Sequence, residues 1–299
     1  MGNRTSAGPP DFLVVGHVVQ DLVPDGGGGE TWRLGGAASY ASLLARNVGL
    51  RTAILTACAP DLPLQDILPG IEVRRVPSER TTQMRNVYPE GGRREQWVPQ
   101  RASPLTAEHL PDEWRDARIV LLGPVAGEID ASLAGSFSRE TLVGAGAQGW
   151  LREIGGDLRV RAVSPQDWDA APVLKHVKAL FLSDEDLLLE EAPAALAEWS
   201  ELVDVLAFTR GYGGADICYN GEWRRFDAYP ADPVDLTGAG DIFAAGFLIR
   251  YAETSAPWEA TRYGACAASL VIEGVGVDGV PTKEAIADRL LVADIGRSR

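Results

Sequence analysis

The sequence predicts an α/β protein, with a doubly wound, mostly parallel sheet flanked by helices and a small antiparallel β lid. Short apolar runs, which are typical of buried strands, alternate with helix-length segments along most of the chain. Residues 71–100 depart from this pattern, because apolar and polar residues alternate there as in an exposed antiparallel sheet. Together the two patterns predict a main sheet and a smaller sheet that stands off it.

The size, charge and cysteine content of the chain limit its organisation and its partners. Its 299 residues, 45% of them hydrophobic, can bury one large core, so we expect a disordered polar tail over residues 1–10 and one domain over residues 11–295. A net charge of −14 argues against a nucleic-acid partner. No apolar stretch is long enough to span a membrane, and Cys58, Cys218 and Cys266 are too dispersed for a disulfide framework or a zinc site. These features favour a cytoplasmic protein.

The N-terminal segments predict the start of the parallel sheet. Residues 11–19 form an apolar run that ends near Gly16 and predicts a buried strand. The glycine-rich residues 24–30 predict a turn or mobile loop, residues 34–49 a helix, and residues 52–59 a second strand. A strand, loop, helix and strand in this order are typical of a doubly wound sheet.

The lid is expected from two segments. Residues 71–100 carry Glu90, Gly91 and Gly92 at the place of a hairpin turn. We expect further lid strands at about residues 18–34.

Further buried strands are predicted at residues 117–125, 140–148, 177–184 and 204–211. Several of these segments end in small or polar residues. Because ligands of open α/β sheets bind at the carboxyl ends of the strands, we expect the site at that edge of the sheet.

The segment VGAGAQG at residues 143–149 matches the G-x-G-x-x-G pattern of dinucleotide sites, with Asp167 and Asp169 further on. It lies in the middle of the chain, and Gly155 and Gly156 interrupt the segment that would have to form the following helix. We therefore expect a glycine-lined strand end at the mouth of the site. The chain contains no G-x-x-x-x-G-K-[ST] phosphate loop.

The segment DLTGAGDIFAAGF at residues 235–247 carries the main chemical signal. If Gly238, Ala239 and Gly240 form a tight loop and Asp241 begins a helix, the loop amides and the helix N-terminus make an anion site. A carboxylate beside that site can accept a proton from a hydroxyl group, which predicts phosphoryl transfer. The alternative is that Asp241 only caps the helix, but capping explains neither the small residues nor Asp235.

This segment resembles the signature of the ribokinase-like (PfkB) carbohydrate kinase family. VVGHVVQD at residues 14–21 is similar to the first strand of that family, GGAASYA at residues 35–41 to its glycine-pair motif, and TRGYGGA at residues 209–215 to its nucleotide loop. Residues 71–100 fall where the family has its lid. The resemblance covers nearly the whole chain after the tail and implies a ribokinase-like fold.

The resemblance also implies roles for the matching residues, with ATP as the phosphoryl donor and Mg²⁺ bridging its phosphates. Asp241 would be the catalytic base, and the residues before it would form the anion hole. The other expected site residues are Gly238, Ala239 and Gly240 for the anion hole, Thr209, Gly211, Gly214 and Asp186 for the nucleotide, Asp21, Gly35, Gly36, Tyr40 and Gln148 for the substrate, and Asp235 and Thr237 for a monovalent cation such as K⁺.

Two departures from the family pattern bear on activity and substrate. The family has N-x-x-E where this chain has Ser183 and Asp186, so the handling of the metal is weakened or rearranged. Tyr40 stands where the family has a sugar-binding Asn, which makes the chain similar to the plant-type myo-inositol kinases. Gln148 and Arg152 in QGWLR either reach the substrate or have a structural role.

These observations predict an ATP-dependent kinase that phosphorylates a hydroxyl group of a small sugar or polyol, with myo-inositol as a specific candidate. Two alternatives stay open: a nucleoside kinase of the same fold, and a catalytically weak sensor that binds a sugar or nucleotide. Exposed lid strands also predict a homodimer that pairs through the lid.

Overall fold

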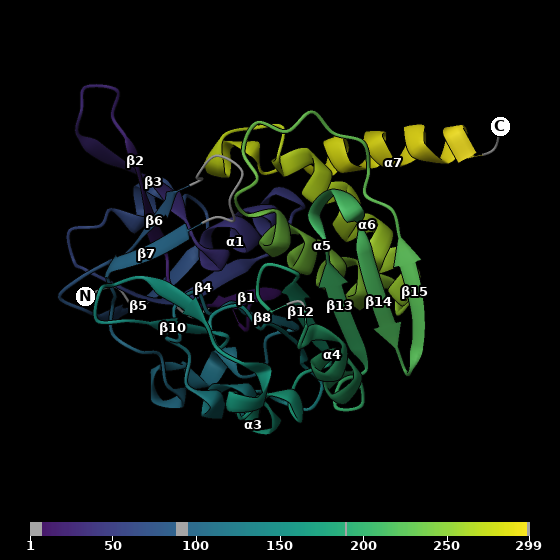
Figure 1. The fold of residues 1–299 in the computed structure, drawn as a ribbon, viewed down its shortest axis with the longest axis horizontal. Coiled ribbons are helices and arrows are strands. Elements are labelled where there is room, and N and C mark those ends of the chain that lie inside the picture. The colour runs from purple at the N-terminus through teal and green to yellow at the C-terminus, as the bar shows by residue number, and fades with distance from the viewer. Residues whose placement is uncertain (1–7, 88–94, 189, 298–299) are drawn as a thin grey trace.

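The structure is a computed structural model that describes residues 8–87, 95–188 and 190–297 (Figure 1). Most of the expected N-terminal tail, and the expected turn at Glu90, Gly91 and Gly92, lie outside the described residues. None of the helices in the described ranges is long and apolar enough to cross a membrane.

The main sheet confirms the predicted fold class. Its strand order is β15-β14-β13-β12-β9-β8-β1-β4-β5, with parallel pairing from β13 through β5 and antiparallel pairing of β13 with β14 and of β14 with β15. The bounds are Phe12–Val15 (β1), Thr52–Cys58 (β4), Glu72–Pro77 (β5), Ile119–Leu122 (β8), Leu142–Gly146 (β9), Ala179–Ser183 (β12), Val205–Thr209 (β13), Ala215–Tyr219 (β14) and Glu222–Phe226 (β15).

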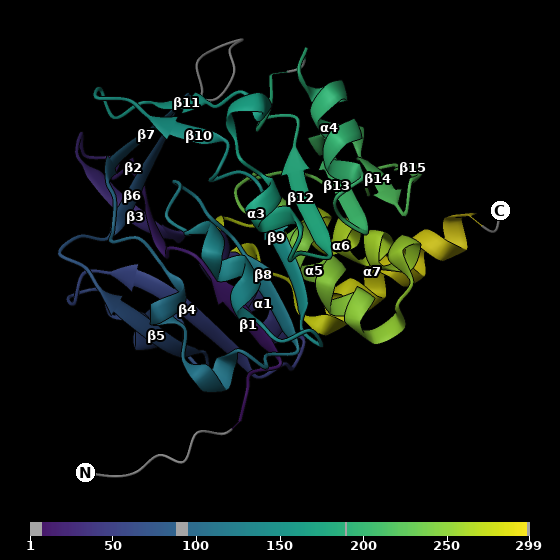
Figure 2. The ribbon, with the colours of Figure 1, turned by 90° about the horizontal axis from the view of Figure 1, so that it is seen from below.

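Helices cover both faces of this sheet because alternate strand residues point to opposite sides. Phe12 and Val14 of β1 belong to the core cluster under α1, α5, α6 and α7, whereas Leu13 and Val15 belong to the cluster under α3, α4 and several 3₁₀ helices (Figures 1 and 2). The bounds are Ala37–Asn47 (α1), Leu64–Ile67 (α2), Ala171–Leu174 (α3), Ala192–Ser200 (α4), Ala239–Thr254 (α5), Pro257–Val271 (α6) and Lys283–Arg297 (α7), with 3₁₀ helices Ala107–His109 (η1), Asp112–Trp114 (η2), Ala131–Ser136 (η3), Pro165–Asp167 (η4), Gly211–Gly213 (η5) and Gly276–Gly279 (η6).

The lid is a separate sheet with the order β3-β2-β6-β7. Its strands are Val19–Pro24 (β2), Glu30–Gly35 (β3), Thr82–Val87 (β6) and Glu95–Gln100 (β7). The expectation that the whole segment 71–100 belongs to the lid is wrong for β5, which pairs in parallel with β4 in the main sheet. β5 is the edge strand there, and its exposed and buried residues alternate as they would in a lid strand.

A hairpin that the sequence did not predict follows β9. The chain makes a turn at residues 148–150 and then forms β10 (Arg152–Ile154) and β11 (Val160–Ala162), which lie beside lid strand β7 in Figure 2. Because a strand and not a helix comes after the glycines of VGAGAQG, this segment lacks the helix N-terminus that a dinucleotide site needs.

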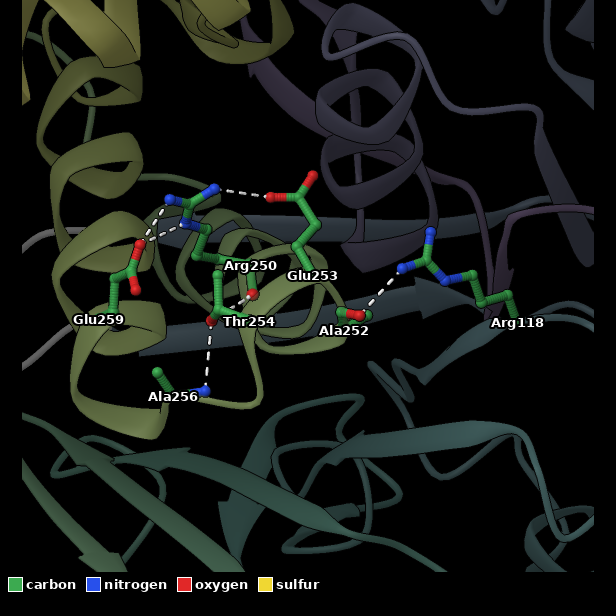
Figure 3. Close-up of polar contacts among 7 residues, drawn as sticks. All are labelled: Arg118, Arg250, Ala252, Glu253, Thr254, Ala256 and Glu259. Atoms are coloured by element: carbon green, nitrogen blue, oxygen red, sulfur yellow. Dashed lines mark hydrogen bonds and ion pairs between the residues drawn. The ribbon is translucent and has the colours of Figure 1, made fainter.

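The C-terminal end of α5 is fastened by polar contacts, which Figure 3 shows. Arg250 forms ion pairs with Glu253 and with Glu259 at the start of α6. Arg118 donates a hydrogen bond of 2.9 Å to the Ala252 carbonyl oxygen from across the fold. These contacts fix the axis of the helix whose other end carries Asp241.

Candidate active site

Helix α5 begins two residues earlier than the sequence predicted. It starts at Ala239 with Gly238 as its N-cap, so Ala239 and Gly240 are helical and do not form a loop before Asp241. The first-turn amides of an α-helix have no partner within the helix, and the helix dipole places positive charge there. Asp241 therefore lies in the first turn, at an end that favours an anion.

Gly238 is a glycine for two reasons. Its φ of 81° is in the left-handed region, which favours glycine. A Cβ atom at this position would also overlap the ring of Tyr40. Tyr40 belongs to α1 and is only 1% exposed, so its ring supports the loop before α5 from beneath.

The glycine pair at the start of α1 makes room for Asp21. A Cβ atom at Gly35 would overlap the Asp21 carboxylate, which lies in lid strand β2. Gly36 has a φ of 85°, and a Cβ atom there would lie 2.6 Å from the His17 carbonyl oxygen. The predicted substrate residues Asp21, Gly35 and Gly36 are thus brought together at the junction of lid and core.

Tyr40 packs against the segments that carry the predicted site residues. Burial is the largest cause that raises the pKa of the Tyr40 phenol, and the negative charges of Asp21, Asp235 and Asp241 raise it further. The ring lies beneath Gly238, and its hydroxyl oxygen is 3.9 Å from the place of a Cβ atom at Gly276, whose amide donates to Asp235. The packing of Tyr40 therefore brings the start of α5 and the loop that carries Asp235 together.

Asp235 is held by backbone amides. Its Oδ1 accepts a hydrogen bond of 3.0 Å from the Thr237 amide, and its Oδ2 accepts one of 3.0 Å from the Gly276 amide. Burial raises the pKa of this carboxyl, but these bonds, a bond from the Thr237 hydroxyl and the charge of Arg33 together hold it below its ordinary value. Asp235 is therefore ionised at neutral pH and ties the loop before α5 to η6.

The predicted nucleotide loop follows β13. Thr209 ends this strand, and Gly211 and Gly214 have left-handed φ values of 50° and 81°. A Cβ atom at Gly214 would overlap the Phe226 carbonyl oxygen, so the loop packs closely on the strand beside it.

Three charged residues that the sequence analysis missed hold the nucleotide loop. Asp216 forms ion pairs of 2.7 Å with Arg210 and 3.2 Å with Arg225, and Arg225 donates a hydrogen bond of 2.7 Å to the Gly213 carbonyl oxygen. Only the antiparallel pairing of β13, β14 and β15 brings these residues together, and a motif search does not include that pairing.

Asp186 turns back onto the end of β12. Its Oδ2 accepts hydrogen bonds from the Ser183 amide (2.8 Å) and the Ser183 hydroxyl (2.9 Å). Ser183 is paired with Thr209 in the sheet, so Asp186 lies at the strand ends that carry the nucleotide loop. The carboxylate is 8% exposed, and within the described residues its other oxygen accepts no hydrogen bond.

The two groups of site residues lie at the same edge of the sheet. Phe243, two residues after Asp241, packs on Phe181 of β12 with ring centroids 6.3 Å apart, and Ser183 ends that strand. Gln148 is half-buried after β9, and its side chain forms no hydrogen bond within the described part of the chain. Two surface hollows, of about 580 and 830 Å³, contain none of the predicted site residues.

Comparisons with known proteins decide the family. The family model described as pfkB family carbohydrate kinase matches residues 147–283. The chain is 30% identical to the inositol 3-kinase of Zea mays, over 93% of this chain and 76% of that protein. The chain belongs to the pfkB family of carbohydrate kinases.

Other relatives of this pfkB kinase differ in substrate. It is 27% identical to the cytidine kinase of Thermococcus kodakarensis, over 85% of this chain and 93% of that protein. Its fold is similar to a pyrophosphate-dependent kinase in the ribokinase family complexed with a pyrophosphate analogue and myo-inositol (TM-score 0.77, 20% identity, 93% of this chain and 99% of that one). It is also similar to Arabidopsis thaliana ribokinase complexed with ribose and ATP (TM-score 0.72, 20% identity, 94% and 99% covered).

This pfkB kinase is therefore a phosphotransferase with an alcohol group as acceptor. Kinases of the ribokinase family use ATP and typically Mg²⁺. Within the described residues no group of three or more His, Cys, Asp and Glu side chains could hold a metal ion.

Proposed function

We propose that this kinase transfers the γ-phosphoryl group of ATP to a hydroxyl group of a small sugar or polyol, and that myo-inositol is its acceptor. One observation carries the proposal: Asp241 lies in the first turn of α5, behind a left-handed Gly238 that packs on the ring of Tyr40. A proton acceptor and a cradle of amides thus lie at one helix end, and Asp21 lies against Gly35, just before the helix that carries Tyr40.

The reaction follows from these positions. The acceptor oxygen bonds to the γ-phosphorus as the bond from phosphorus to the β,γ-bridging oxygen breaks, and ADP leaves with that electron pair. The hydroxyl proton moves to the Asp241 carboxylate. The amides of Gly238, Ala239 and Gly240 stabilise the charge that develops on the transferred group. The lid over the acceptor keeps water from the γ-phosphorus.

Two ions belong to this proposal. Mg²⁺ supplies positive charge between the phosphates, and the oxygen of Asp186 that Ser183 leaves unbonded fits the hard oxygen ligand that this ion prefers. Asp235, whose depressed pKa keeps it ionised, and Thr237 would hold a monovalent cation such as K⁺ beside the anion site.

The preference for a polyol rests on Tyr40. The resemblance to the family implies that this buried ring stands where a sugar-binding Asn would lie, and Asp21, against Gly35, is the carboxylate proposed for acceptor hydroxyls. The 30% identity with an inositol 3-kinase supports this choice. The 27% identity with a cytidine kinase favours a nucleoside kinase as the alternative.

The first test is ATP consumption with Mg²⁺ and K⁺ against myo-inositol, ribose, fructose, 2-keto-3-deoxygluconate and nucleosides including cytidine, with pyrophosphate as donor in a parallel series. We expect turnover with ATP and myo-inositol. Turnover with cytidine instead would establish the nucleoside kinase. If ATP raises the melting temperature but no acceptor is phosphorylated, the chain is a sensor, and the Ser183→Asn, Asp186→Glu double variant then tests whether those two residues account for the lost activity.

A homodimer through the lid is also proposed. Strand β3 is an edge of the lid sheet, and unpaired strand edges favour pairing with a second copy. Light scattering across a concentration series measures the mass of the assembly directly.

A further inference from the structure

The β10–β11 hairpin joins the core to the lid. It follows β9 of the main sheet, and its residues lie along lid strand β7 (Figure 2). Arg159 forms an antiparallel bridge with Trp97. The Val98 amide donates a hydrogen bond of 2.9 Å to the Leu158 carbonyl oxygen. The hairpin, which is a separate two-stranded sheet, is therefore attached to the lid strand β7 by this bridge and this hydrogen bond.

Side chains strengthen this contact. The Arg159 guanidinium lies 2.6 Å from Glu95 Oε1 and 5.7 Å from the centre of the Trp97 ring. Ile154 and Val160 of the hairpin pack on a small apolar cluster between lid and core, whose members are Val19, Met84, Val98, Val125 and Ala126. The ion pair at Glu95 and the apolar packing at Val98 thus both hold strand β7.

Arg152 connects the hairpin to the lid and to the loop after β8. It lies four residues after Gln148 in the QGWLR motif, and its Nη1 donates a hydrogen bond of 3.0 Å to the Val125 carbonyl oxygen in the loop after β8. Its Nη2 donates one of 3.0 Å to Gln96 Oε1 in β7, and Gln96 in turn donates to Asn86 in β6. The Arg152 guanidinium therefore links lid strand β7 to the loop after β8, and its own backbone belongs to the hairpin after β9.

The turn of the hairpin, which the bonds from the Leu158 amide to Gly155 and from the Gly155 amide to Arg159 close, has a costly backbone conformation at the residue that contacts the lid. Leu158 has a φ of 64°, which is unfavourable for a residue with a branched side chain. Its carbonyl oxygen is the one that bonds to Val98. Such strain persists only where the surrounding structure enforces it.

We propose that the β10–β11 hairpin is a fixed clamp on the lid and that Arg152 is a positioning residue for the acceptor site. By holding β7, the clamp fixes the sheet that carries Asp21 over Gly35, so the acceptor is bound tightly and water is kept from the donor phosphate. The effect on the reaction rests on the kinase function proposed above, whereas the clamp itself rests on geometry alone.

The test compares Arg152→Gln and Arg159→Gln with Arg161→Gln. Arg161 lies on the same hairpin and pairs with Asp157 at 2.7 Å inside it, so its variant removes the same charge and leaves the lid contacts in place. The measurements are the KM for the acceptor, the KM for ATP, the ratio of ATP hydrolysis without acceptor to phosphoryl transfer, and hydrogen exchange at the Val98 amide.

In the Arg152 and Arg159 variants we expect the acceptor KM, the hydrolysis ratio and the exchange rate of Val98 each to rise about tenfold, with the KM for ATP unchanged. Arg152→Lys, which keeps one donor and the charge, should recover part of each effect. The proposal is overturned if both variants behave like Arg161→Gln, or if Val98 exchange rises while the acceptor KM stays that of the wild type. If the wild type phosphorylates no acceptor, the proposed function fails, and Val98 exchange alone decides whether the clamp exists.

Discussion

The two ends of helix α5 are built in opposite ways. At its N-terminus Gly238 and Gly240 have no side chains, and the first turn carries Asp241 as its one acidic group. At its C-terminus Arg250 pairs with Glu253 and Glu259, and the Thr254 hydroxyl bonds to the Arg250 carbonyl oxygen (Figure 3).

The C-terminal end of α5 therefore anchors the helix, whereas its N-terminal end faces the proposed substrate site. At the C-terminus the Thr254 hydroxyl and the Arg118 guanidinium donate hydrogen bonds to the Arg250 and Ala252 carbonyl oxygens, which leaves fewer carbonyl groups unpaired at this end. At the N-terminus the Ala239 amide donates a long hydrogen bond of 3.4 Å to the Leu236 carbonyl oxygen, and the bare backbone of Gly238 and Gly240 leaves room for a ligand beside it. The segment between them, Ile242–Ile249, is buried throughout, so core packing holds the helix between its two ends.

The largest expected effect is at Asp241. Asp241→Asn keeps the shape of the side chain but removes the proton acceptor, and we expect kcat to fall about 10³-fold. Because the amides stay in place, stabilisation of the protein against heat by ATP should persist. Turnover within tenfold of the wild type would exclude Asp241 as the base.

The next largest effect is on stability, and it should differ between Gly238→Ala and Gly240→Ala at the N-terminus of α5. Gly238→Ala puts a methyl group into the Tyr40 ring at a left-handed φ, so we expect the free energy of unfolding to fall by about 2–3 kcal/mol and activity to fall with it. A Cβ atom at Gly240 meets open space, so Gly240→Ala should change stability by less than about 1 kcal/mol.

Activity should nevertheless fall in Gly240→Ala, because in the proposed function a phosphate approaches the first turn of α5, where the methyl group would stand. Chemical denaturation and steady-state kinetics on both variants check this pair. Equal loss of stability in the two would show that the N-terminal end is held by packing at both positions.

At the C-terminal end of α5 we expect a substitution to lower stability and to leave activity nearly unchanged. Arg250→Gln breaks ion pairs whose side chains are 35% to 47% exposed, so we expect a loss of about 1 kcal/mol in the free energy of unfolding. Its kcat should stay within about twofold of the wild type, because the amides at the other end are unchanged. A tenfold loss of kcat would mean that these ion pairs set the position of Asp241.

The smallest effect is a pH dependence at Asp235. The pKa of this carboxyl is lower in the folded protein than the ordinary value of 3.8, so its contribution to stability is complete above that value. As the pH falls, the unfolded chain takes up the proton first and the contribution is lost. The difference in unfolding free energy between the wild type and Asp235→Asn should therefore shrink from pH 5 to about pH 3. A constant difference over that range would contradict the role of the two amide bonds.

The sequence predicted the sheet and the signature segment well because both are local patterns. Buried parallel strands are continuous apolar runs, and the small residues of 238–240 lie next to one another in the chain. The start of α5 was misplaced because a helical glycine cannot be distinguished from a loop glycine by residue type. Strand β5 was misassigned because an edge strand of the main sheet alternates like a lid strand.

Other features could not be predicted, because they depend on contacts between distant segments. Nothing near Tyr40 in the sequence indicates that its ring packs under Gly238. The strands of the β10–β11 hairpin, Arg152–Ile154 and Val160–Ala162, are too short to show a period of two. The network of Asp216 with Arg210 and Arg225 appears only when β14 pairs with its neighbours.

The hairpin has a consequence for the size of any assembly. The hairpin contacts the edge strand β7 through the bridge from Arg159 to Trp97 and the hydrogen bond at Val98, whereas no strand of the described residues pairs with the outer side of β3. A sheet with two open edges can add copies without limit, as fibres do, whereas a sheet with one can add a single partner. Pairing through β3 would consume the open edge of both copies, so growth would stop at two.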